Sequence, residues 1–170
     1  MRRFAFAPVT AGVLLAIAGA AQADIRTTTF QVNAVVNPNC LVSATPMSFG
    51  TYSGTAQLST TSQINVRCSL GAPYTLALST GGGSFATRLL AGNGNNRLEY
   101  NLYTTDPTLG SGSIWGDGTS STVRGTGTGG GMSVNNAIQH TVYGLLPNST
   151  ANQNVPTGTY TDTITVTVEY

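Results

Sequence analysis

The chain has 170 residues, of which 40% are hydrophobic and only 8% are charged, against about 25% charged residues in a typical soluble domain. All seven basic residues are arginine, lysine is absent, and six acidic residues leave a formal net charge of +1. This composition offers no basic patch for neutralising phosphates, which argues against nucleic acid as a partner.

Residues 1–23 have the pattern of a secretory signal peptide. Arg2 and Arg3 form a basic start, an apolar stretch follows, and that stretch ends at the small-x-small cleavage site Ala21-Gln22-Ala23. We therefore predict an exported mature chain of residues 24–170, in which five arginines face six acidic residues. That length is sufficient for one domain with a core.

The first predicted strand pattern lies at the start of the mature chain. Four apolar side chains share one side there, Phe30, Val32, Ala34 and Val36, and the residues between them are polar except Val35. We interpret residues 24–38 as a free segment whose strand inserts into another molecule. The alternative is that residues 30–36 form the subunit's own first strand and that only residues 24–29 project. The polar residues 25–29 cannot fill an apolar groove, which favours the first interpretation.

Two cysteines, Cys40 and Cys68, follow the signal peptide, and an exported chain with two cysteines predicts a disulfide. The bridge would close a loop of about 28 residues and contribute roughly 3–4 kcal/mol in the chain-entropy model. A reactive thiol pair or a metal site is the alternative. The sequence has no CxxC motif and only one histidine, which favours the structural disulfide.

Further strand patterns are bounded by glycine, proline, asparagine or serine, and helical periodicity is nearly absent. Together they predict an antiparallel sandwich of six to seven strands within residues 39–170. The expected strands are an interrupted edge strand around Pro46, then residues 64–68, 74–78, 98–102, 141–145 and 160–170. The glycine-rich run 125–131 lacks the Lys-Ser/Thr and the helix of a phosphate loop, so we expect a flexible hairpin connection there.

The last twelve residues alternate almost without error. One side carries Ile164, Val166, Val168 and Tyr170, whereas the threonines between them and Glu169 point to the other side. Because no strand follows this one in the sequence, we expect a vacant position beside it in its sheet, with an exposed edge.

Residues suited to catalysis or ligand binding do not combine into a site. His140 has no carboxylate-and-serine arrangement near it in sequence, and the six acidic residues are scattered. Asp106 and Asp117 lie in predicted loops whose spacing matches no cation-binding loop. Trp115 could stack on a sugar, but its flanking Ile114 and glycines favour a position capping the core. We predict no enzyme activity, no catalytic residue, no cofactor, no metal and no small-molecule substrate.

Several motifs occur together in one order along the mature chain: Asn39-Cys40, Phe49-Gly50, Cys68, Leu98-Glu99-Tyr100-Asn101-Leu102-Tyr103, Trp115-Gly116-Asp117-Gly118, Val142-Tyr143-Gly144 and residues 158–170. With these motifs, the chain resembles the spore coat protein U domain family, which is shared with archaic (Csu-type) chaperone–usher pilins. The resemblance implies an incomplete immunoglobulin-like sandwich that lacks its last strand and is completed by a donor strand. It also implies a periplasmic chaperone and an outer-membrane usher as partners, and a final location in a fibre on the cell surface.

These observations lead to one functional hypothesis. Phe30, Val32, Ala34 and Val36 form the donor strand, and the edge at Ile164, Val166, Val168 and Tyr170 borders the groove and pairs with the chaperone. The expected partners are identical or related subunits, the chaperone and the usher, in a fibre that serves adhesion and biofilm formation. The alternatives are a secreted coat protein of resting cells and a carbohydrate-binding adhesin that uses Trp115.

Overall fold

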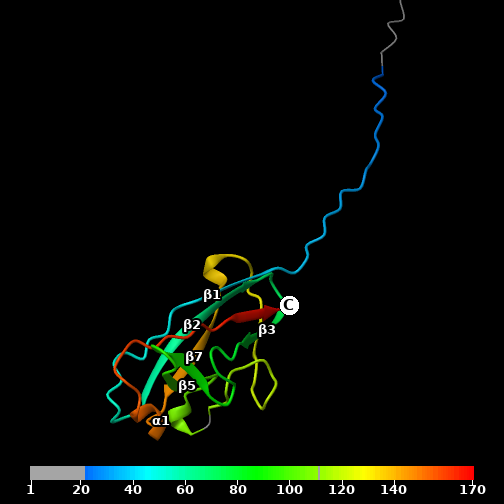
Figure 1. Ribbon diagram of the computed structural model, residues 1–170. Helices are drawn as coiled ribbons and strands as arrows, with labels where there is room; N and C mark the ends of the chain where they lie inside the picture. Colours follow the sequence, from blue (N-terminus) through cyan, green and yellow to red (C-terminus); the bar gives the residue numbers. More distant parts are fainter. Residues whose placement is uncertain (1–21, 111) are drawn as a thin grey trace, which may run out of the picture. The chain divides into compact units, whose positions relative to one another are not determined.

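The computed structural model describes residues 22–110 and 112–170 (Figure 1). Residues 1–21, which hold most of the predicted signal peptide, lie outside the described residues. The chain divides into two units, Met1–Val35 and Val36–Tyr170. In the first unit, the described residues have no helix or strand and are exposed; the Phe30 side chain is 85% accessible to solvent. The second unit contains all the strands assigned among the described residues.

A five-stranded antiparallel sheet forms one layer of the second unit. Its strands, in spatial order, are β1 (Cys40–Ala44), β2 (Leu58–Cys68), β7 (Ile138–Leu146), β5 (Arg97–Tyr103) and β4 (Arg88–Ala91). The register places Cys40 opposite Cys68 and Ile64 opposite His140. Alternate residues of β2 and β7 are buried, which is the result of one sheet face lying on the core.

A three-stranded antiparallel sheet forms the facing layer. Its central strand is β3 (Pro73–Leu78), flanked by β6 (Gly125–Thr128) and β8 (Val166–Glu169). The alternating side chains of Tyr74, Leu76 and Leu78 are all at most 3% exposed, so β3 crosses the centre of the core. The short helices η1 (Pro107–Leu109), η2 (Val134–Asn136) and α1 (Thr150–Gln153) lie in the connections. Among the described residues, no helix has the length and apolar character needed to cross a membrane.

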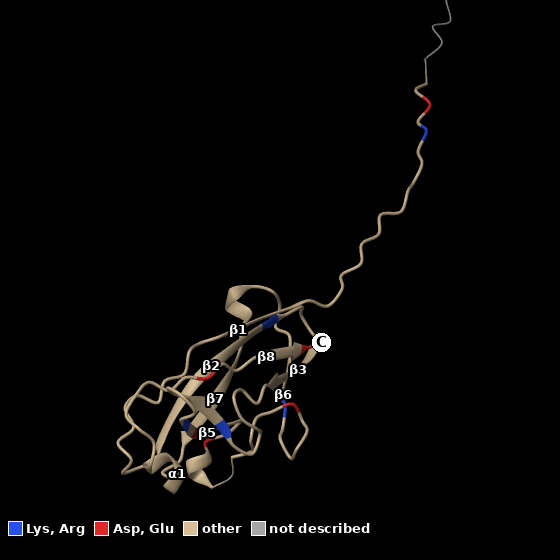
Figure 2. Ribbon diagram, viewed as in Figure 1, with Lys and Arg blue, Asp and Glu red and all other residues tan. Residues whose placement is uncertain are grey.

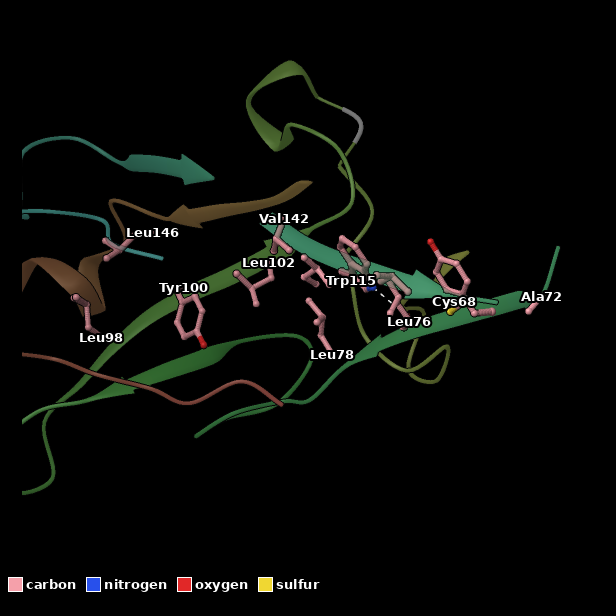
Figure 3. Close-up of a cluster of buried hydrophobic side chains, with 13 residues drawn as sticks. Cys68, Ala72, Leu76, Leu78, Leu98, Tyr100, Leu102, Trp115, Val142 and Leu146 are labelled. Carbon is pink, nitrogen blue, oxygen red and sulfur yellow. Dashed lines mark hydrogen bonds between the residues drawn. The ribbon is translucent and has the colours of Figure 1, made fainter. Parts of the chain in front are cut away.

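The core lies between the two sheets (Figure 3). Leu102 and Val142 of the larger sheet face Leu76 and Leu78 of the smaller one. Trp115 is 2% exposed, and its Nε1 donates a hydrogen bond of 3.2 Å to the Leu76 carbonyl. The prediction that Trp115 belongs to the core is therefore confirmed.

One arginine is fully buried in this core. Arg88 of β4 is 0% exposed, and its guanidinium donates hydrogen bonds to the carbonyl oxygens of Ser79 and Trp115 and to Oδ1 of Asn101. Burial lowers the pKa of Arg88. A buried charge is tolerated when its donors are satisfied, and these acceptors join β4 to β5, to the end of β3 and to the Trp115 segment.

The two antiparallel sheets and the small helix content confirm the predicted fold class. The patterned strands are found in β2, β3, β5 and β7, and β1 occupies the expected sheet edge. The strand expected across residues 160–170 is shorter, because only Val166–Glu169 forms a ladder with β3. The second half of the interrupted edge strand, at residues 47–49, is not a strand.

The prediction of a connection across residues 125–131 is wrong for its first four residues, because Gly125–Thr128 is strand β6 and pairs with β3, whereas residues 129–131 have no assigned strand. Aromatic side chains of the core explain the glycines. A Cβ at Gly125 would lie 2.5 Å from Cζ2 of Trp115, and one at Gly127 would overlap the Tyr74 hydroxyl. These glycines therefore let a strand approach two buried rings, where side chains would not fit.

Candidate functional site

A groove with a volume of about 960 Å³ runs across the part of the larger sheet that the smaller sheet leaves uncovered. Its floor consists of core side chains from β2, β3, β5 and β7: Ile64, Leu78, Leu98, Tyr100, Leu102, Val142 and Leu146. Figure 3 shows Leu98 and Leu146 at one end of this core, close to α1, and Cys68 and Ala72 at the other. Most of the remaining lining comes from two chain segments, residues 44–54 and 152–166, and Ser62 of β2 and Leu90 of β4 complete it.

The first wall, residues 44–54, continues from the end of β1. The Thr45 amide donates to the Gln63 carbonyl at 2.9 Å, which extends the β1–β2 ladder by one step. Pro46 follows, and proline has no N–H with which to continue a ladder. From there to the start of β2 the chain has no assigned strand, so this wall is held by its side chains.

Those side chains dock onto a glycine of β7. A Cβ at Gly144 would lie 2.5 Å from Sδ of Met47 and 3.0 Å from Cζ of Phe49, so the absence of a side chain there makes a notch that both residues enter. The Phe49 ring also meets Tyr100 in an edge-to-face contact, with ring centroids 6.0 Å apart. This geometry is the favoured one for aromatic pairs.

The second wall is the end of the chain, which bridges the two sheets. Thr161 exchanges two backbone hydrogen bonds with Ala91 at the edge of the larger sheet. Further on, the Ser79 amide donates to the Thr165 carbonyl at 3.0 Å, and β8 then pairs with β3.

Between Thr161 and Thr165, Asp162 links the second wall to neighbouring segments by hydrogen bonds. Its carboxylate accepts hydrogen bonds from the Gly82 amide and, at 2.7 Å, from the Tyr100 hydroxyl. Asp162 is the only charged side chain among the described residues that line the groove. Burial and the hydrogen bond to Asp162 both raise the pKa of Tyr100, so the tyrosine remains a neutral donor.

Within residues 22–110 and 112–170, no strand is hydrogen-bonded to one edge of β8. The backbone groups of Thr165 point toward β3, and successive residues of a strand direct these groups to opposite sides. The N–H and C=O groups of Val166 and Val168 therefore face the open edge. This is the arrangement to which another extended segment can add by main-chain hydrogen bonding.

The four residues predicted for the groove edge fall into two pairs. Ile164 and Val166 line the groove and are half-buried against the core. Val168 packs against the core but lies outside the groove lining, and Tyr170 is 58% exposed. Exposed and half-buried side chains alternate from Thr161 to Glu169, as the sequence pattern predicts.

The groove presents apolar surface that is incompletely covered. Its floor residues are at most 6% exposed, whereas the apolar side chains of its walls and rim are half-buried. They are Met47, Phe49, Tyr52, Leu90, Val155, Tyr160, Ile164 and Val166. An apolar trough beside an unpaired strand edge can bind an extended peptide with alternating apolar side chains.

The four predicted donor residues lie in or next to the first unit. Phe30, Val32 and Val36 are 81–87% exposed, and Ala34 is exposed as well. No strand is assigned to residues 22–39, and the first strand of the second unit begins at Cys40.

The predicted disulfide is present between Cys40 and Cys68. The two cysteines are direct partners in the β1–β2 ladder, so the bridge joins the first residue of β1 to the last residue of β2.

The residues considered for chemistry do not converge. His140 shares a 2.8 Å hydrogen bond with the Tyr74 hydroxyl and packs edge-on against Trp115. Burial lowers the pKa of His140.

Asp106 and Asp117 lie in separate turns. Thr108 donates a hydrogen bond to Asp106 and Thr119 donates one to Asp117, and these bonds lower the pKa of each carboxyl. Charged residues are sparse along the ribbon of the second unit (Figure 2), and the described residues contain no group of three metal-ligating side chains.

The wall at residues 44–54 and its notch at Gly144 were not predicted from the sequence. The backbone of this wall forms no strand ladder. Its sequence therefore shows no alternation of apolar and polar residues from which the wall could have been predicted. The glycine within the otherwise bulky strand 141–145 was a usable signal, since an isolated strand glycine often marks a close approach.

Comparisons with known proteins give a family and a fold. A family model described as the Spore Coat Protein U domain matches residues 26–167. One chain of the crystal structure of the CsuC–CsuE chaperone–tip adhesion subunit pre-assembly complex, from archaic chaperone–usher Csu pili of Acinetobacter baumannii, matches with a TM-score of 0.54 and 25% identity. The match covers 79% of the present chain and 40% of the other chain. A comparison with curated protein sequences gave no significant match.

Proposed function

Because the chain belongs to the Spore Coat Protein U domain family, we propose that it is a structural subunit of a secreted surface fibre. In this proposal, the N-terminal segment of one copy occupies the groove of the next and completes its sandwich by donor-strand complementation. The groove beside the unpaired edge of β8 is the observation that carries the proposal.

The chemistry of the N-terminal segment matches that of the groove. Phe30, Val32, Ala34 and Val36 recur with the period of a strand and are exposed, and the half-buried walls of the groove are apolar. Burying the three larger side chains at ~1.5–3 kcal/mol each, and Ala34 for less, yields roughly 5–10 kcal/mol. That amount is comparable with the net stability of a domain, so an unfilled groove leaves the free subunit marginally stable.

The absence of an assigned strand in the described residues 22–39 favours the donor role of residues 30–36 over a role as the subunit's own first strand. The donor segment and the groove are different surfaces of one chain. A contact between two different surfaces is heterologous, and it propagates into an open filament unless it closes into a ring. The proposed unit of function is therefore a head-to-tail fibre.

The route of assembly follows from the exposed edge. A subunit with an open strand edge is prone to aggregate, so a chaperone that pairs along Ile164, Val166, Val168 and Tyr170 would protect it in the periplasm after removal of the signal peptide. An outer-membrane usher would then exchange that chaperone for the next donor segment. The similar structure from A. baumannii is a chaperone–subunit complex of a chaperone–usher pilus, which supports this part of the proposal.

The proposed role of the fibre is adhesion and biofilm formation. A sugar-binding site built on Trp115 finds no support, because its ring is 2% exposed and its N–H is used within the core.

The test uses a chain that lacks residues 24–36 and a synthetic peptide of that segment. The shortened chain should not polymerise and should have a low Tm. At 100 times its Kd the peptide should add ~2.7 kcal/mol, or about 10 °C in Tm for a chain of this size. Two altered peptides supply the matched comparison. Val32→Asp places a charge on the inserting side and should abolish the shift, whereas Gln31→Asp lies on the outer side and should retain it.

A shortened chain that is already stable and indifferent to the peptide would remove the proposal. Equal shifts with the Val32→Asp and Gln31→Asp peptides would show that binding does not use the alternating side chains.

A further inference from the structure

The point at which the N-terminal segment enters the domain is tied to the interior of the larger sheet. Asn39 and Ser69 exchange hydrogen bonds, with the Ser69 amide donating to the Asn39 carbonyl at 2.9 Å. In the next ladder position, Cys40 and Cys68 are joined by the disulfide. The entry point is thus held by covalent and hydrogen-bonded links to the end of β2.

Strand β1 by itself is a weak attachment. It has five residues, lies at the sheet edge and pairs only with β2. Leu41 and Val42 are 47% and 37% exposed, so its side chains bury little apolar surface. Few hydrogen bonds and little burial mean that a short edge strand detaches at low cost.

Strand β2 is a far stronger attachment. It has eleven residues, pairs with β1 on one side and through nine residue pairs with β7 on the other. Its inward side chains Ile64, Val66 and Cys68 are at most 1% exposed. Detaching β2 would open the core.

Strand β1 also leads directly into the groove. Its last residue, Ala44, is the first lining residue of the wall at residues 44–54. The wall has almost no backbone pairing of its own beyond Thr45. If β1 were pulled from β2, this wall would follow, and a strand held in the groove would lose one of its two sides.

From these contacts we infer that the Cys40–Cys68 disulfide is a mechanical clamp, which passes tension from the N-terminal segment into β2 and so spares β1 and the groove wall. The inference rests on the proposed function for its biological meaning, because tension enters at residue 40 only if that segment is held by a neighbouring subunit. A fibre whose subunits each carry this clamp keeps its grooves closed on their donor strands while it is stretched.

Single-molecule force spectroscopy on the chain from residue 24 tests this clamp, with handles at its two ends and with the donor peptide present or absent. The intact chain should unfold without an early low-force event. Its total extension should be shorter by about 100 Å, because the loop between the cysteines stays closed. The Cys40→Ser/Cys68→Ser variant should show an early event at lower force that frees residues 40–57, about 65 Å, and releases a bound peptide.

General loss of stability is separated from loss of the clamp by Leu76→Ala, in the centre of β3. This variant lowers the free energy of unfolding but retains the disulfide, and it should unfold without the early event. If the serine variant does not fold, the disulfide of the folded intact chain is reduced with a thiol reagent before pulling. Tension then enters at Cys40 without passing to Cys68, and the early event should occur.

The inference is overturned if the serine variant unfolds in the same steps and at the same force as the intact chain, or if the intact chain shows the early event when pulled from its N-terminus. Peptide binding and polymerisation are measured separately without force. A failure of the proposed function would therefore appear as a lack of binding, and a failure of the clamp as unchanged unfolding steps.

Discussion

The two ends of the core are built from equally apolar side chains but differ in how their backbones are covered. At the Cys68 end, β3 lies over the larger sheet and is paired on both sides, by β6 and β8. At the Leu98 end, two segments with few backbone pairs flank the groove. Side-chain burial alone therefore does not close a sandwich; a strand must also satisfy the edges on either side of it.

Because of this difference, substitutions at the two ends should differ in their effects on stability and on donor binding. At the covered end, a truncation should reduce stability and leave donor binding unchanged. At the groove end, truncating a side chain should weaken donor binding by more than the buried area of that side chain would predict. Three substitutions test this difference between the two ends and a fourth tests the pH dependence of stability; they follow in order of decreasing effect on stability.

Trp115→Ala should have the largest effect, a loss of ~3–5 kcal/mol in the free energy of unfolding, because it removes a fully buried aromatic ring. Trp115 does not line the groove, so the stabilisation by the donor peptide should equal that of the unaltered chain. Urea unfolding with and without peptide measures both quantities. A peptide effect that also disappears would mean that the two ends form one cooperative site.

Phe49→Ala should cost less, about 1–2 kcal/mol, because the ring is only half-buried. The substitution removes the contact with Tyr100 and opens the first wall, so the peptide should bind more weakly by at least tenfold. Calorimetric titration of the peptide gives the affinity. Unchanged peptide affinity would exclude this wall from the binding site.

Gly144→Ala should cost about 1 kcal/mol, the low end for an added core methyl group, because the atoms nearest to that group are the end of the flexible Met47 side chain and the Phe49 ring. Both must move out of the notch, and the wall moves with them. Peptide affinity, measured by the same titration, should therefore fall although stability changes little. Leu70→Ala is the control, since Leu70 is 82% exposed and lies outside the groove lining.

The smallest effect concerns pH. Burial lowers the pKa of His140 below its ordinary value of 6.5, so the unfolded chain binds the proton more readily. The stabilising contribution is complete above pH 6.5 and is lost as the pH falls through the pKa of the folded state. His140→Gln should flatten the dependence of the free energy of unfolding on pH in this window. An unchanged slope would assign that dependence to other groups.

Strands with a clear alternation were predictable, and those without it were not. Residues 74–78 and 98–102 have the period of a half-buried strand and lie in β3 and β5. Strand β4 was missed because it begins with Arg88, and a charged residue is expected at the surface until its buried carbonyl partners are known. Strand β6 was missed because glycine and threonine resemble a loop, and only the rings of Tyr74 and Trp115 reveal why glycine is needed.

The candidate site was predictable in part for the same reason. The alternation at residues 164–170 identifies a strand, and it places Ile164 and Val166 on the side that the structure brings to the groove. The same alternation extends to Val168 and Tyr170, which lie outside the lining, because the end of the groove is set by other segments. The opposite wall, at Met47 and Phe49, has no alternating sequence pattern from which it could be predicted.

Local sequence was sufficient for the period of the strands and for the pairing of the cysteines, because the period depends on neighbouring residues and the chain has only two cysteines. The order of strands in each sheet, the burial of Arg88, the notch at Gly144 and the position of the groove emerged only in the folded chain. These features depend on contacts between residues far apart in the sequence, and a local pattern carries no information about which distant backbone will satisfy a strand edge.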